Sequence, residues 1–120
     1  MAAPNIVNVA TITGITTGRA LTTTTTTQLL TNVASSNKVF KVNSIVVANV
    51  DGSSAADVTI AYNDGSTSYH LASTVSVPAD STLIVADKNS SFYLEEGDLI
   101  RGGASANSDL ECLITYEELS

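Results

Sequence analysis

Apolar and polar residues alternate with a period of two along much of this chain. In the run from Asp57 to Tyr62, every second residue is apolar, and the same holds from Leu110 to Tyr116. A period of two places successive side chains on opposite faces of an extended backbone, so these runs predict strands with one buried face. Helical periodicity is nearly absent.

Turn-forming clusters separate the runs. Asn63-Asp64-Gly65-Ser66 is the strongest, because Asp-Gly readily supplies the positive φ angles of a tight hairpin. Turns spaced by about 8–12 residues, with no helix between them, predict a single antiparallel β-sandwich, either jelly-roll or immunoglobulin-like. The predicted strands are Ile6–Thr13, Thr25–Thr31, Val39–Asn49, Asp57–Tyr62, Thr67–Val77, Thr82–Ala86, Ser91–Leu94, Leu99–Ala104 and Leu110–Glu117.

In two of the predicted strands, the positions of the apolar residues indicate which side chains face the core. In Val39–Asn49 the apolar phase changes at Asn43-Ser44, which indicates either a bulge or a strand buried on both faces. In Thr67–Val77 the alternation places His70 on the outer face and four apolar residues together on the other. These four are Tyr69, Leu71, Val75 and Val77.

The first part of the chain differs from the rest. It contains two spaced glycines and the threonine tract Thr22–Thr27, whose branched side chains favour extended backbone without forming a core. We interpret residues 1–24 as an N-terminal arm or edge segment, and residues 25–120 as the sandwich domain. The alternative, in which the segment forms the first strand of the sandwich, is equally compatible with the sequence.

Composition and charge exclude several classes of partner. Only 14% of residues are charged, and the net charge is −7 with five scattered Lys and Arg residues, so nucleic-acid binding is not expected. The most apolar stretch, Ile45–Val50, is far shorter than the roughly 20 residues that span a bilayer, and the N-terminus lacks the pattern of a signal peptide. We therefore expect no membrane partner and synthesis in a cytoplasm.

No group of residues predicts catalysis, and we expect neither enzymatic activity nor a cofactor. His70 is the only histidine, and no nucleophile with a positioning acid accompanies it. Cys112 lies in phase with apolar neighbours, which favours core packing over a reactive thiol. Glu95, Glu96 and Asp98 flank Gly97 in a turn that could offer oxygen ligands to calcium, but Asp-x-Asp-x-Asp spacing is missing.

Glycine and aromatic residues also predict structure more than chemistry. Gly102-Gly103 is followed by no Lys-Ser or Lys-Thr, so we interpret it as a bend or a close backbone approach and not as a phosphate loop. Sugar-binding modules present exposed aromatic side chains, whereas the four tyrosines fall at or beside positions predicted to be buried. These tyrosines are Tyr62, Tyr69, Tyr93 and Tyr116.

Three stretches together resemble a known protein family. The segment Ser73–Val85 reads as a strand, a turn opened by Pro78 and a second strand. It is followed by Phe92-Tyr93-Leu94-Glu95-Glu96-Gly97-Asp98 and by the ending Ile114-Thr115-Tyr116-Glu117-Glu118-Leu119-Ser120. This combination is similar to small virion proteins of tailed bacteriophages, particularly those that infect marine cyanobacteria. The resemblance covers residues 38–120.

The resemblance implies a structural virion protein without catalytic, cofactor-binding or metal-binding residues. A capsid decoration (cement) protein on the capsid surface is the expected function, with the major capsid protein and further copies of itself, as a homotrimer, as its partners. No small-molecule substrate is expected. A tail, neck or fibre component is the first alternative, and a carbohydrate- or calcium-binding surface module is the second.

Overall fold

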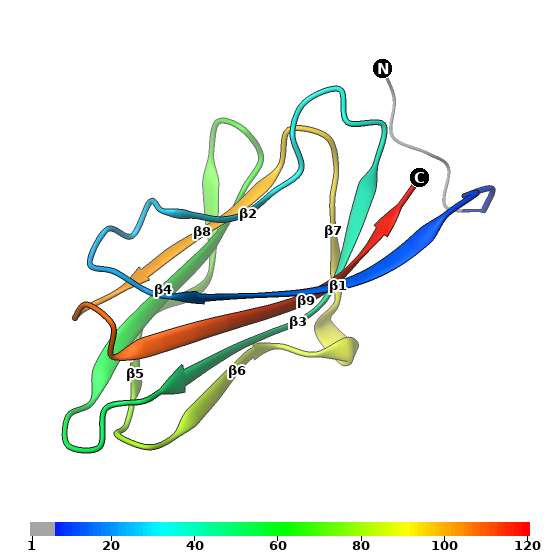
Figure 1. The fold of residues 1–120 in the computed structure, drawn as a ribbon. Helices are drawn as coiled ribbons and strands as arrows, with labels where there is room; N and C mark the ends of the chain where they lie inside the picture. Colours follow the sequence, from blue (N-terminus) through cyan, green and yellow to red (C-terminus); the bar gives the residue numbers. More distant parts are fainter. Residues whose placement is uncertain (1–6) are drawn as a thin grey trace.

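The alternating runs form strands that bury one face and are joined by tight turns. The computed structural model describes residues 7–120 of the chain (Figure 1). Its strands are β1 (Ile12–Ala20), β2 (Gln28–Thr31), β3 (Val39–Asn49), β4 (Ala56–Asn63), β5 (Ser68–Val77), β6 (Thr82–Ala86), β7 (Phe92–Leu94), β8 (Leu99–Ala104) and β9 (Leu110–Leu119), with a 3₁₀ turn, η1 (Lys88–Ser90), before β7. None of the helical segments in this part of the chain is long and apolar enough to cross a membrane.

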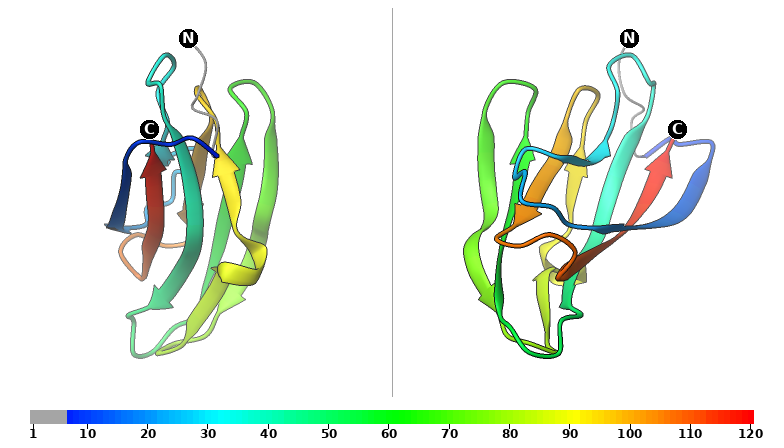
Figure 2. Two further views of the ribbon diagram at one scale, coloured as in Figure 1. Left: turned by 90° about the vertical axis from the view of Figure 1, so that its right-hand side faces the viewer. Right: turned by 60° about the vertical axis from the view of Figure 1, so that its left-hand side comes forward.

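The strands form two antiparallel sheets that face each other (Figure 2). The first sheet has the order β1-β9-β3-β6, and β7 also pairs with β3; the second has the order β2-β8-β4-β5. The all-β sandwich expected from the sequence is therefore confirmed.

The strand order distinguishes between the two sandwich types that the sequence left open. β6 and β7 lie one after the other along β3, so together they act as one interrupted strand. Within residues 7–120 the fold then has eight strand positions in two four-stranded sheets, and β4 with β5 is the one pair of consecutive strands there that are hydrogen-bonded neighbours. This order is that of a jelly roll and differs from the immunoglobulin order, in which several consecutive strands are neighbours.

The core lies between the sheets and is almost entirely aliphatic. The inward side chains of β3 and β9 pack against those of β4 and β8, and burial of this apolar area is the main stabilising contribution. The largest fully buried side chains are Leu21, Ile45, Ile60, Leu94, Ile100, Leu110 and Ile114.

Bulges explain where the alternation keeps or loses its phase. In β3 the register with β9 shifts between Val42 and Ser44, so of the two alternatives for Asn43-Ser44 the structure shows the bulge. In β5 two register shifts against β4 rotate the strand, and Ala72 faces the core. The prediction that Leu71 shares the buried face is therefore wrong, and Leu71 is 40% exposed. Tyr69 lies opposite Tyr62, as its phase predicted, but it is 58% exposed and not buried.

The N-terminal part joins the sandwich at the edge of the first sheet. The strand predicted over Ile6–Thr13 is displaced: β1 begins at Ile12 and pairs with β9 over its whole length. The described part of the segment is thus both an edge segment and the first strand. The expected arm also includes residues 1–6, which lie outside the described residues.

The threonine tract, which precedes β2 in sequence, continues the second sheet beyond the first residue of β2. The Gly102 N–H donates to the Thr27 carbonyl (3.0 Å), and the Ala104 N–H donates to the Thr22 carbonyl (2.8 Å). The tract therefore covers the edge of β8, which explains why a run of threonines without apolar side chains is ordered here.

Candidate functional site

His70 lies on the outer side of β5, as predicted, and its side chain is exposed. Its neighbour across the strand pair is Ala61, which offers no acid or nucleophile. Within residues 7–120, no three His, Cys, Asp or Glu side chains come together in a group that could hold a metal ion.

Cys112 packs in the core, as the apolar phase predicted. Its side chain is buried, and this burial raises the pKa of the thiol to about 12, so the sulfur is protonated at neutral pH. Reactive cysteines need an accessible thiolate, and this environment favours the thiol.

The carboxylates of the Glu95–Asp98 turn serve separate structural contacts. Asp98 is buried, and its Oδ2 accepts hydrogen bonds from the Glu95 N–H (2.8 Å) and the Tyr62 hydroxyl (3.0 Å). The Glu96 carboxylate instead accepts from the Asn37 N–H at 2.9 Å. These contacts hold the turn against the β2–β3 loop and against β4, and they do not direct the oxygens to a common centre.

The outer face of the first sheet carries the clearest binding surface. One residue from each of four adjacent strands lies in a row: Gly18 of β1 is opposite Leu113 of β9, Leu113 is opposite Val46 of β3, and Val46 is opposite Ile84 of β6. We call these four residues the outer row. Leu113 and Ile84 are 48% and 62% exposed, so apolar surface faces solvent along the row.

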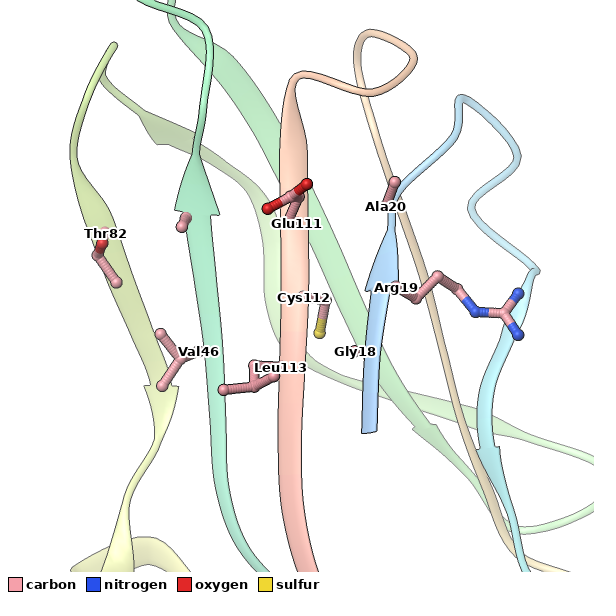
Figure 3. Close-up of a pocket in the computed structure, with 9 residues that line it drawn as sticks. Gly18, Arg19, Ala20, Val46, Thr82, Glu111, Cys112 and Leu113 are labelled. Atoms are coloured by element: carbon pink, nitrogen blue, oxygen red, sulfur yellow. The ribbon is translucent and has the colours of Figure 1, made fainter. Parts of the chain in front are cut away.

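A second row lies beside the outer row and consists of Ala20, Glu111, Ala48 and Thr82. All residues of the two rows except Ile84 line an open concavity of about 490 Å³, together with Arg19 and Cys112 (Figure 3). Glu111 is the charged residue of the two rows, and the side chain of Arg19 extends away from β9 in Figure 3. The floor consists of glycine, alanine and valine, and it lets another surface approach the sheet closely.

Charges lie farther along the same sheet, away from the concavity. The Lys38 ammonium pairs with the Glu118 carboxylate (3.1 Å), and the Asn43 amide donates to Glu117 (3.2 Å). Exposed pairs of this kind contribute little to stability. On the outer face itself, Glu117 of β9 lies opposite Lys41 of β3, so the face carries charge beyond the concavity.

A second candidate surface lies where β5 and β7 border the open side of the sandwich. A groove of about 330 Å³ is lined by Tyr62, Leu71, Ser90, Phe92 and Tyr93. The Tyr62 ring lies 6.5 Å from the Tyr69 ring and 6.4 Å, edge-on, from the Phe92 ring. Four of the six Phe and Tyr residues thus gather here.

The exposure of this group corrects the expectation that the tyrosines lie at buried positions. Tyr69 and Tyr93 are 58% and 43% exposed, whereas Tyr116 is buried against Phe40. Partial burial and the bond to Asp98 raise the pKa of Tyr62 to about 12. Its hydroxyl therefore remains a neutral donor at the end of the groove.

Neither surface could be found from the sequence. The outer row depends on the register of three strand pairs, and the groove depends on contacts between β5 and a strand of the other sheet. One sequence feature does indicate the outer row. Leu113 is an apolar residue on the exposed face of β9, where the neighbouring odd-numbered residues are polar.

No protein-family model matches this chain, and no curated protein shows a significant match to it.

Proposed function

We propose that this protein is a structural component of a tailed-phage virion that binds and stabilises the capsid as a decoration protein. The observation that carries the proposal is the outer row with its neighbouring concavity. A contiguous apolar surface on a small protein of low charge favours contact with another protein. The resemblance of residues 38–120 to phage virion proteins suggests the capsid as the partner.

The chemistry of the face fits a protein partner better than a substrate. Small residues at Gly18, Ala20 and Ala48 let the backbone of a partner approach closely, while Leu113 and Ile84 supply the apolar area. Burying one such side chain contributes roughly 1.5–3 kcal/mol. In this proposal the protein has no catalytic role, and it resides on the capsid surface.

The test is co-sedimentation of the purified protein with phage heads that lack it, together with the heat resistance of the loaded heads. Wild-type protein is expected to bind and to raise the temperature at which the heads open. Leu113→Lys should weaken binding by about 10- to 100-fold, because an ammonium would be buried unpaired in the interface.

The matched control is Ser76→Lys, which adds the same charge at an exposed position of β5 on the other sheet. Circular dichroism verifies that both variants fold. Equal binding by both variants would contradict the assignment of the face, and absence of binding by the wild-type protein would contradict the proposal. Labelled protein that decorates tails instead of heads would favour the tail, neck or fibre alternative.

The aromatic groove favours carbohydrate binding as a second candidate function. Exposed tyrosine rings combine an apolar face with a hydroxyl, and a sugar needs both. Jelly-roll folds also occur in lectins, although a fold by itself does not specify a function. A glycan array with wild-type protein and Tyr93→Ala tests this: loss of a specific signal in the variant would support it, and no signal from either protein would exclude it for the sugars on the array.

A further inference from the structure

The strand β1 forms the edge of the first sheet and has no neighbouring strand on its outer side among residues 7–120. Thr11 and Ser120 exchange both of their backbone hydrogen bonds, at 3.0 Å each, at the start of the β1–β9 pairing. Hydrogen-bonded and non-bonded pairs alternate along an antiparallel ladder, so the odd-numbered residues of β1 bond to β9. The N–H and C=O groups of the even-numbered residues from 12 to 20 therefore point away from β9, where no strand of residues 7–120 pairs with them.

The other sheet edges are short or irregular, as edges that avoid pairing usually are. β5 contains two register shifts and a left-handed residue, Thr74 (φ 53°). β2 has four residues and a register shift, and β6 and β7 have five and three residues. β1, in contrast, has nine residues in continuous register, no proline and one charged residue, Arg19.

We propose that β1 pairs antiparallel with β1 of a second copy of this chain, about a two-fold axis through Thr16. In this register Gly14 faces Gly18, and the axis lies at a Thr16–Thr16 pair. The remaining pairs are Ile12 with Ala20, Thr13 with Arg19, and Ile15 with Thr17. Every residue of the strand is paired, and the two arginines face threonines instead of each other.

The free backbone groups match this register. The pairs 12–20, 14–18 and 16–16 join even-numbered residues only, and these are the residues whose N–H and C=O groups point outward. Each of these pairs can exchange both hydrogen bonds. The self-complementary spacing of the glycines about Thr16 is what makes a second copy a better occupant than an unrelated strand.

The pairing closes at two copies because the same edge is used on both sides. It would join the two first sheets into one continuous sheet and place both outer rows on a single face. A dimer of this kind replaces the trimer that the resemblance implied. The pairing does not rest on the proposed function, since it requires no capsid.

The first test is the mass of the protein in solution, measured by sedimentation equilibrium over a range of concentrations. Twice the chain mass of 12.4 kDa is expected at high concentration. A monomer at all concentrations, or a trimer, would overturn the proposal. Failure of the protein to bind phage heads would leave this result untouched, so the two proposals are tested separately.

The second test uses Thr16, whose N–H faces the partner and not β9. Thr16→Pro removes that donor without removing a backbone β1–β9 hydrogen bond, and Thr16→Lys places two ammonium groups opposite each other. Each Thr16 variant, the Thr16→Val control included, also loses the 3.4 Å contact between the Thr16 and Thr115 hydroxyls, so the control accounts for that loss. Each change should raise the dimer dissociation constant at least tenfold, while Thr16→Val should leave it within about threefold. Thr16→Lys covers the case in which the proline variant does not fold.

The third test fixes the register by oxidation. Hydrogen-bonded cross-strand pairs have Cα atoms about 5.5 Å apart, within the range that a disulfide spans. Thr16→Cys should therefore form a covalent dimer, whereas Thr13→Cys should not, because its partner is Arg19. A dimer that Thr13→Cys cross-links better than Thr16→Cys, or that none of the Thr16 variants affects, would disprove the pairing.

Discussion

Gly102 and Gly103 show at the scale of single residues why β8 can lie in the middle of the second sheet. A Cβ atom on Gly102 would lie 2.6 Å from the Thr59 carbonyl oxygen and 2.7 Å from a methyl group of Ile60. A Cβ on Gly103 would lie 2.7 Å from the Thr24 carbonyl oxygen. The close backbone approach expected for this pair is thus present on both faces of the strand, toward the core and toward the threonine tract.

Gly102→Ala is therefore expected to destabilise the protein by roughly 1–3 kcal/mol, because the added methyl group forces backbone and core atoms apart. Urea unfolding followed by circular dichroism measures the change. Gly52→Ala is the matched control, since the nearest atoms to its Cβ are carboxylate oxygens 4.0 Å away, and its effect should stay within about 0.5 kcal/mol. Equal stability of the two variants would contradict the packing argument.

At the scale of elements, buried asparagines hold the loops to the strands. The Asn32 amide donates to the Lys38 carbonyl (2.8 Å) and to the Leu94 carbonyl (3.0 Å), so it connects the β2–β3 loop to β7 of the other sheet. Asn49, the last residue of β3, has a similar role. Its amide donates to the carbonyls of Ser54 in the β3–β4 loop and Val77 in β5, at 2.9 Å each. Both side chains are fully or almost fully buried, so their bonds have no water to replace them.

Replacement of Asn32 by leucine should lower the free energy of unfolding by roughly 2–3 kcal/mol, because the Lys38 and Leu94 carbonyl groups lose the donor that Asn32 provides. The comparison is with Asn89→Leu, in the exposed 3₁₀ turn, which should change the free energy of unfolding by less than about 0.5 kcal/mol. Chemical denaturation measures both. If Asn32→Leu is as stable as the wild-type protein, the amide does not hold the loop.

The sequence predicts the elements of this fold better than it predicts their faces. β3, β6 and β8 begin and end where the alternation and the flanking turns place them. The predicted face of β5 is wrong between its two register shifts, where Ala72 and not Leu71 faces the core, and no residue in Ser68–Val77 signals these shifts. β1 was placed too early, because the alternation from Ile6 to Ile12 gives no information on its partner, whereas pairing with β9 determines where the strand lies.

At the scale of the whole molecule, buried titratable groups connect stability to pH. The ordinary pKa of a cysteine, 9.0, is raised to about 12 at Cys112, and that of tyrosine, 10.0, is raised to about 12 at Tyr62. Burial also raises the pKa of Tyr116. Between these values the unfolded chain loses protons that the folded protein keeps.

Stability is therefore expected to be constant with respect to these groups below about pH 9 and to fall as pH rises toward 12, since the unfolded state binds fewer protons there. Urea midpoints at pH 7, 8, 10 and 11 measure the decline, and the first two serve as the internal reference. Cys112→Ala should show a shallower decline over the same range. If the urea midpoint of Cys112→Ala declines with pH as steeply as that of the wild-type protein, the thiol does not contribute to the pH dependence of stability.

The position of β9 has a consequence for synthesis of the protein. This last strand lies between β1 and β3 and pairs with both, so Ile12 and Val39 each find their neighbour only at Leu119. On a ribosome, the first sheet stays incomplete until β9 has emerged, and closing so long a loop costs chain entropy before any contact offsets it. The edges of β1 and β3 that face β9 therefore stay unpaired until β9 has been synthesised, and folding of the first sheet depends on the arrival of this strand.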